Sequence, residues 1–275
     1  MNGIQRRTRG AGNRTLRGRK SISPKCERLP LVHVTSTGWA REIIFAEQLE
    51  TCECDVLGEH LVYFFALRPA YRSAGEAAKS DQLGRFPAVF LIDAKSLGAP
   101  YHVYPFDTGG AVKGVFGDAP NPTVFLEDYE LEPTLHAAAE HIAWAFGKKA
   151  AYFDGELVSD LEDSLPQFDE VARSFLTVAR LASSRHNAPD RRASSIEVAY
   201  KRHVGLKGNS ILAVLPKQYL EDGPHKNTAL ISQMNAIGLK WTVYDWQPNT
   251  APLDYQDDLT RILRDHLTKT SELDG

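Results

Sequence analysis

Short runs of bulky apolar residues most constrain what this chain can fold into. Each run is about six residues long, and several are bounded by Gly, Pro or charged side chains, which is typical of β-strands. The runs are 31–35, 61–66, 87–92, 195–200, 211–215 and 241–246. Helical spacing of apolar residues predicts helices after Thr37 and at 134–147, 167–184, 226–237 and 256–268. No apolar run approaches the roughly 18 residues of a membrane-spanning helix. The combination of these strands and helices predicts an α+β fold.

Charge is distributed unevenly along the chain. Residues 1–28 carry nine Lys and Arg against one Glu, a net charge of +8, whereas the rest carries 23 basic and 34 acidic residues, a net charge of −11. With almost no large apolar side chains, the 1–28 tail is expected to be disordered and to bury nothing. It is either an arm that neutralises nucleic-acid phosphates or a solvated terminus. Residues 29–275 contain no internal repeat and no linker, which predicts a single domain.

Several common functional motifs are absent. The chain has no P-loop, no GxGxxG after a strand, no HExxH and no GxSxG. Three cysteines cannot form a disulfide framework, which is typical of a cytoplasmic protein. Cys52 and Cys54 form a lone CxC that favours strand cysteines over a zinc site, so no metal is predicted. Asp107 begins an Asp-Thr-Gly, but a protease needs a second such carboxylate; we expect Asp107 to cap a turn or help to shape a pocket.

Polar residues interrupt several predicted strands. His33 lies in the first strand, and Thr35, two positions on, shares its face. Arg68 follows the strand in LVYFFALRPAYR, with Tyr71 and Arg72 just beyond. Two guanidinium groups and a phenol at a strand end are suited to binding a phosphate or stacking on a base. The alternatives are a hydrogen-bonded core histidine and a turn with surface arginines.

Glu197 is the third polar feature. It lies between Ile196 and Val198 in RRASSIEVAY, so it faces the side of the strand opposite to two apolar residues. This alternation predicts that Glu197 lies near an active face. A solvent-facing Glu on an ordinary strand is the alternative interpretation.

Together these pieces resemble the ADP-ribosyltransferase superfamily, with the H-Y-E and DNA-modifying, DarT-like branches nearest. LVHVTSTGWAREIIFAEQL is similar to its first strand and helix, and RRASSIEV is similar to the strand that carries its catalytic Glu. The resemblance covers residues 30–248. Residues 73–133 have no counterpart, and the family's Tyr-or-Arg position is open among Tyr63, Arg68, Tyr71 and Arg72.

The resemblance implies a split β-sheet core with flanking helices, NAD as co-substrate and no metal. It implies that Glu197 and Tyr71 are catalytic. NAD would be bound by the remaining polar residues, which are His33, Thr35, Tyr63, Arg68 and Arg72. The expected function is mono-ADP-ribosyl transfer of bacterial toxin or antiviral defence type.

The expected acceptor is a nucleic acid or a protein. The basic tail would contact a DNA or RNA acceptor, an antitoxin or regulator is a further expected partner, and no membrane is expected. Two alternatives remain open. One is a nucleic-acid-binding module without NAD chemistry. The other is a metal-independent nuclease or phosphotransferase using His33, Arg72 and His203.

Overall fold

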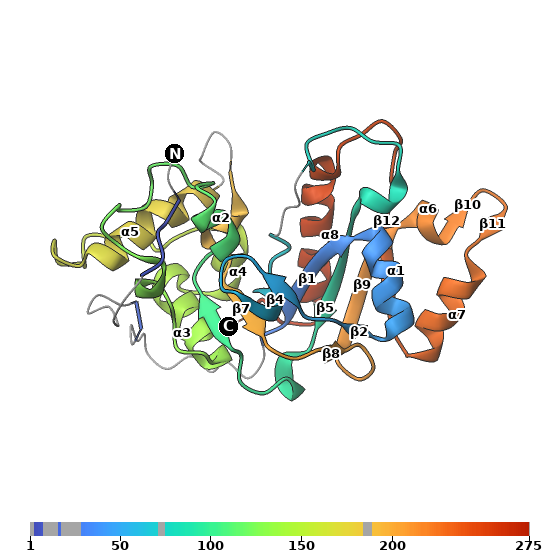
Figure 1. Cartoon of the computed structure of the whole chain (residues 1–275), viewed down its shortest axis with the longest axis horizontal. Helices are drawn as coiled ribbons and strands as arrows, with labels where there is room; N and C mark the ends of the chain where they lie inside the picture. Colours follow the sequence, from blue (N-terminus) through green and yellow to red (C-terminus); the bar gives the residue numbers. More distant parts are fainter. Residues whose placement is uncertain (1–2, 8–15, 18–28, 71–74, 184–188, 275) are drawn as a thin grey trace.

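The computed structural model describes residues 3–7, 16–17, 29–70, 75–183 and 189–274 (Figure 1). Its centre is an eight-stranded sheet in the order β12-β9-β5-β1-β4-β7-β6, with β3 paired to β4. The strands are β1 (Leu31–Ser36), β3 (Cys52–Cys54), β4 (Glu59–Ala66), β5 (Pro87–Ile92), β6 (His102–Tyr104), β7 (Glu197–Tyr200), β9 (Ser210–Pro216) and β12 (Trp241–Tyr244). Only the β12–β9 pair is parallel within this described sheet, so the sheet is mixed.

Two short two-stranded sheets complete the β-structure of the described residues. β2 (Gln48–Leu49) pairs with β8 (Val204–Gly205), and β10 (Glu221–Asp222) pairs with β11 (His225–Lys226). Both pairings are antiparallel. The β2–β8 pair joins the chain after the first helix to the chain after β7, near one end of the central sheet.

Helices flank the sheet in two groups, with α1, α6 and α7 near β12 and α2 to α5 near β6 (Figure 1). The α-helices are α1 (Thr37–Ala46), α2 (Thr108–Val112), α3 (Leu135–Phe146), α4 (Lys149–Asp154), α5 (Glu170–Ala179), α6 (Lys217–Leu220), α7 (Thr228–Ala236) and α8 (Gln256–Lys269). The 3₁₀ turns are η1 (Leu83–Arg85), η2 (Ala94–Ser96), η3 (Leu126–Asp128), η4 (Arg180–Ala182), η5 (Arg191–Ser194) and η6 (Pro252–Tyr255). None of the helices in the described ranges has the length and apolar character that crossing a membrane requires.

The central sheet is split between β1 and β4. β1 pairs with β5 along all six residues from Leu31 to Ser36, but with β4 only at Leu31 and Val32. Beyond Val32 the two neighbouring strands therefore diverge and leave an opening in the sheet. A mixed sheet with this split and flanking helices confirms the predicted α+β split-sheet architecture.

Helix and strand bounds follow the sequence signals closely where those signals are long. α1 begins after Ser36, whose hydroxyl accepts a hydrogen bond from the Trp39 backbone N–H, within the predicted Thr35–Thr37 cap. α3 begins after Thr134, which caps it in the same way, and ends at Gly147, whose φ of +75° suits glycine. β3 confirms the predicted strand at Cys52 and Cys54. Short elements such as β6 and α2 have too few residues to show a period and were not predicted.

The N-terminal residues that the structure describes differ from the expected contact-free tail. Ile4 is 5% exposed and Leu16 is 1% exposed. The Ile4 N–H donates to the Ala111 carbonyl at 2.9 Å, and Arg7 Nη2 donates to both carboxylate oxygens of Asp128, at 2.6 and 2.7 Å. Ile4 and Leu16 are buried, so the expectation that the segment buries nothing is wrong for these two residues. The remaining residues of the predicted 1–28 tail lie outside the described residues.

Candidate functional site

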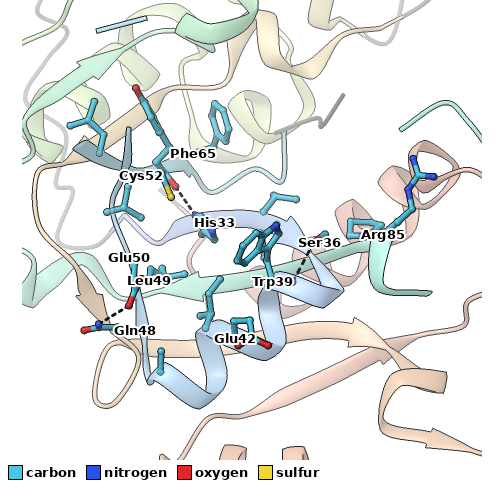
Figure 2. A pocket seen from close by; sticks show the side chains of 18 of the residues that line it. His33, Ser36, Trp39, Glu42, Gln48, Leu49, Glu50, Cys52, Phe65 and Arg85 are labelled. Atoms are coloured by element: carbon cyan, nitrogen blue, oxygen red, sulfur yellow. Dashed lines mark hydrogen bonds between the residues drawn. The ribbon is translucent and has the colours of Figure 1, made fainter. Parts of the chain in front are cut away.

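A cleft of about 780 Å³ opens where β1 and β4 diverge (Figure 2). Its walls come from β1 and α1 on one side and from β3 and β4 on the other, with further residues from the loops near Arg85 and Gln256. His33, Thr35 and Tyr63, three of the residues predicted from sequence, line this cleft. The split in the sheet thus brings together side chains that are about thirty positions apart in the chain.

His33 bridges the two diverging strands. Its Nδ1 lies 2.9 Å from the carbonyl oxygen of Tyr63, which as an acceptor requires the proton on Nδ1 (Figure 2). Burial lowers the pKa of His33, an effect that the backbone hydrogen bond partly offsets. The ring is therefore neutral near pH 7 and has an acceptor nitrogen, Nε2, available for a hydroxyl donor.

Tyr63 is the aromatic wall of the same opening. Its hydroxyl donates to Cys54 Sγ at 2.7 Å, which ties β4 to β3. Burial, and then the charge of Glu197, raise the pKa of Tyr63 well above its usual value. The phenol therefore stays protonated.

The strand register places Glu197 on the cleft side of the sheet. Glu197 lies directly opposite Phe65 on β4 and Tyr104 on β6, and directly opposite residues of antiparallel strands point to the same face. Phe65 and Tyr63 both line the cleft. Glu197 itself is only 2% exposed and is not part of the cleft wall. It lies next to the cleft, beneath a cover of neighbouring side chains.

Three donors hold the Glu197 carboxylate. The Thr108 hydroxyl donates to Oε1 at 2.7 Å and the Thr108 backbone N–H donates to Oε2 at 3.1 Å. His102 Nε2 lies 3.1 Å from Oε1, so this nitrogen carries the proton. Both partners are 2% exposed or less. This set of donors fixes the buried carboxylate in one orientation. Sequence reasoning missed His102, which lies in no motif, and it considered Thr108 only as the middle residue of the Asp-Thr-Gly stretch.

Asp107 shapes this arrangement from the adjoining turn. Its carboxylate accepts a hydrogen bond from the Gly110 backbone N–H and caps α2, which confirms the predicted capping role. A Cβ atom at Gly110 would lie 3.1 Å from the Asp107 carboxylate, so glycine leaves room for the cap. Burial, and then the charge of Glu197, raise the pKa of Asp107 to about 6. Two carboxylates thus lie close together behind the cleft.

Arg68 is placed differently from its predicted role at the phosphate. It is 1% exposed, its Nη1 donates to the Ser194 hydroxyl at 2.7 Å, and it is not part of the cleft wall. Leu67 turns the chain through a left-handed conformation, φ +58°, and thereby directs Arg68 into the protein behind β4. Its Nε and Nη2 are buried without a hydrogen-bond partner among the described residues. Burial lowers the pKa of Arg68 to about 10, so the side chain stays charged.

The other predicted residues are outside the cleft wall or outside the described ranges. Tyr71 and Arg72 belong to the undescribed residues 71–74. His203, the third member of the nuclease alternative, is exposed; its Nδ1 accepts a hydrogen bond from the Thr51 backbone N–H, and it does not line the cleft. Cys52 is exposed and Cys54 is partly buried. The described residues contain no cluster of three or more metal-ligating side chains.

Comparison with solved structures finds a likeness to Thermus sp. 2.9 DarT in complex with NAD⁺. The two share 9% sequence identity, and the superposition covers 81% of this chain and 98% of that chain with a TM-score of 0.37. No protein-family profile matches the chain, and no curated protein matches it.

Proposed function

We propose that this protein is an NAD-dependent mono-ADP-ribosyltransferase. The observation that carries the proposal is the split in the sheet, which brings His33, Thr35 and Tyr63 to one cleft, with Glu197 beside it on the strand face that carries Tyr63 and Phe65. Those residues occupy the positions that the sequence resemblance assigns to NAD binding and catalysis. The cleft volume of about 780 Å³ is within the range of small-molecule sites.

His33 is suited to binding a sugar hydroxyl. Its Nδ1–H is used by the Tyr63 carbonyl, so the neutral ring offers Nε2 as an acceptor. A ribose hydroxyl supplies the matching donor, and Thr35 on the same face of β1 adds a hydroxyl that donates or accepts. These contacts are equally available to substrate and transition state, so they set affinity more than rate.

Glu197 is the group proposed to act on the scissile bond. The C1′–N bond between ribose and nicotinamide breaks, and its electron pair stays on the ring nitrogen, which makes nicotinamide a neutral leaving group. A nucleophile of the acceptor then bonds to C1′ and loses its proton to solvent or to a base. Positive charge develops on the ribose as in glycoside hydrolysis, and an adjacent carboxylate stabilises that charge.

Glu197 must rearrange to perform this role. Its carboxylate is 2% exposed and bonded to His102 and Thr108. Contact with a ribose 2′-hydroxyl requires it to exchange at least one of these bonds for the substrate. The Thr108 N–H and hydroxyl are the donors that the ribose would replace.

The acceptor is proposed to be a nucleic acid, in keeping with a toxin or defence role. The support is the +8 charge of residues 1–28. Three of those arginines are already paired with the body. Arg6 contacts Glu127, Arg7 contacts Asp128 and Arg17 contacts Glu130. A nucleic acid would therefore compete with acidic side chains for part of this charge.

The decisive experiment is to incubate the purified protein with NAD labelled in the adenylate moiety and a cell lysate. We expect label to enter a product that nuclease releases, and Glu197→Gln to lower the rate by on the order of a hundredfold or more. Glu197→Gln keeps the shape of the side chain, and its NAD affinity should change little. Label released by protease alone would instead make a protein the acceptor.

Two outcomes would contradict the proposal. One is the absence of both NAD binding and NAD consumption in the wild-type protein. That result, combined with tight oligonucleotide binding, would favour the nucleic-acid-binding module. The other is full NAD turnover by folded Glu197→Gln, because the reaction would then not depend on the proposed carboxylate.

A further inference from the structure

Two side chains at the rim of the cleft have no structural role that explains them. Trp39 on α1 is 68% exposed, although tryptophan is usually largely buried. Arg85, at the end of η1, is also exposed. Among the described residues, neither forms a ring contact, a cation–π contact or a side-chain ion pair. Both line the cleft (Figure 2).

The backbone holds these two side chains at one rim. The N–H and the hydroxyl of Thr37 both donate to the Phe86 carbonyl, at 2.7 and 2.8 Å. A Cβ atom at Gly38 would lie 3.3 Å from the Gly84 carbonyl oxygen, so two glycines allow α1 and η1 to pack backbone to backbone. Trp39 and Arg85 are the residues that follow these glycines. Their placement therefore results from fixed, buried contacts rather than from a free loop.

The chemistry of the rim differs from that of the Glu197 side. An exposed indole offers a flat apolar face on which a planar ring stacks, and an unpaired guanidinium binds phosphate oxygens in two parallel hydrogen bonds. Arg85 is the only Lys or Arg among the described residues that line the cleft; the acidic residues there are Glu42, Glu50 and Glu76. Anionic phosphate thus has one cation available within the described wall.

The cleft consequently has two chemically distinct ends. In Figure 2, Phe65, which lies opposite Glu197 in the sheet, and Arg85 lie on opposite sides of the cleft, with His33 and Trp39 between them. A dinucleotide also has two different ends: the ribose that bears the reactive bond lies in one half, the purine lies in the other, and the diphosphate joins the two halves.

We propose that Trp39 and Arg85 form the subsite for the purine and diphosphate half of NAD, with the indole stacked on the ring and the guanidinium on the phosphates. Arg85 then takes the phosphate role that the sequence assigned to Arg68 or Arg72. This inference rests on the proposed function. It adds the direction in which NAD lies in the cleft, its reactive ribose toward Glu197.

The test measures ligand binding rather than turnover. ADP and adenosine are titrated into the wild-type protein, Trp39→Ala and Arg85→Gln, by calorimetry and by tryptophan fluorescence. We expect Trp39→Ala to weaken ADP binding by on the order of tenfold or more, since stacking on an aromatic side chain contributes about 1–3 kcal/mol per base. Arg85→Gln should weaken ADP binding to a similar extent and leave the affinity for adenosine unchanged. Arg85→Lys should restore only part of the lost ADP affinity.

Fluorescence supplies a readout specific to Trp39. ADP should quench the emission of the wild-type protein, and Trp39→Phe should lose this quenching while retaining part of the affinity. Phe45→Ala and Arg41→Gln are matched controls on the same helix, because both side chains are exposed and neither lines the cleft. Both controls should bind ADP like the wild type.

The outcomes that overturn the subsite differ from those that overturn the activity. Unchanged ADP affinity in both rim variants overturns the subsite and leaves the proposed transferase intact if NAD is still consumed in a Glu197-dependent reaction. Quenching by a short oligonucleotide but not by ADP also overturns it, and makes the rim a contact for the acceptor. If the wild-type protein binds neither ADP nor NAD, both proposals fail.

Discussion

The two ends of the cleft differ in how their side chains are held. At one end, Glu197 is 2% exposed and bonded to His102 and Thr108. At the other end, Trp39 is 68% exposed, and it and Arg85 have no side-chain partner among the described residues. The Glu197 end is therefore part of the protein core, whereas Trp39 and Arg85 are exposed side chains on a rigidly held backbone.

This difference separates stability from recognition. A substitution at the Glu197 end leaves buried polar groups without partners, so it changes the free energy of unfolding together with the chemistry. A substitution at the rim removes surface that water already contacts, so it changes ligand affinity alone. The following predictions test this separation, ordered by the expected change in the free energy of unfolding.

The largest effect is expected from Arg7→Gln. Residues 3–7 lie against the Glu197 end, since Ile4 bonds to Ala111 of α2 and Arg7 bonds to Asp128. The Asp128 side chain is fully buried, so removing Arg7 leaves a buried carboxylate without its cation, at a cost of about 3–5 kcal/mol. Urea unfolding measures this change.

Arg6→Gln is the matched control for Arg7→Gln. The Arg6–Glu127 pair is 44% and 28% exposed, so its loss should cost less than about 1 kcal/mol. An Arg7→Gln effect as small as that of Arg6→Gln would mean that Arg7 does not stabilise the buried end.

A second test uses the pH dependence of Asp107. Its pKa is raised from 3.8 to about 6, so between these values the folded protein holds a proton that the unfolded chain has released. Stability therefore falls as pH rises from about 4 to about 6, by on the order of 3 kcal/mol. Asp107→Asn keeps the cap and removes the titrating group, so its stability should vary less over this range. Parallel pH profiles for both proteins in urea unfolding would contradict this account.

Thr108→Val removes one hydroxyl donor from Glu197 while retaining the side-chain shape. Glu197 keeps His102 and the Thr108 backbone N–H, so we expect a loss of about 1–3 kcal/mol. Thr108→Ser retains the hydroxyl and should restore most of this loss. Thermal unfolding of the wild type and the two variants measures this difference. Equal stability of the Val and Ser variants would show that the Thr108 hydroxyl contributes nothing to the free energy of unfolding.

The smallest effect is expected at the rim. Trp39→Ala should change the free energy of unfolding by no more than about 0.5 kcal/mol, because the side chain is exposed and has no partner among the described residues. Ile44→Ala on the same helix is the contrast: Ile44 is fully buried and its truncation should cost about 2–5 kcal/mol. A Trp39→Ala cost near that of Ile44→Ala would remove the distinction between the two ends.

Sequence predicted most of the fold, because long elements carry their period in the residues themselves. The helix at Leu135–Phe146 and the strands at Leu31–Ser36 and Pro87–Ile92 fall within a residue or two of the predicted bounds. The strand His102–Tyr104 and the helix Thr108–Val112 were missed, since three to five residues show no period. These two short elements supply the partners of Glu197, so the candidate site was only partly predicted.

The sequence by itself determined the alternation that places Glu197 on one strand face, the capping residues and the surplus of basic residues before residue 29. The partners of those residues were decided by the tertiary structure. Arg68 is buried behind β4 because the chain turns at Leu67, and Arg7 pairs with Asp128 across 121 positions. Trp39 and Arg85 lie at one rim of the cleft because two glycines let α1 approach η1. Periodicity records which side of an element a residue faces, whereas the contacts of that face depend on segments distant in the chain, which only the packed fold brings together.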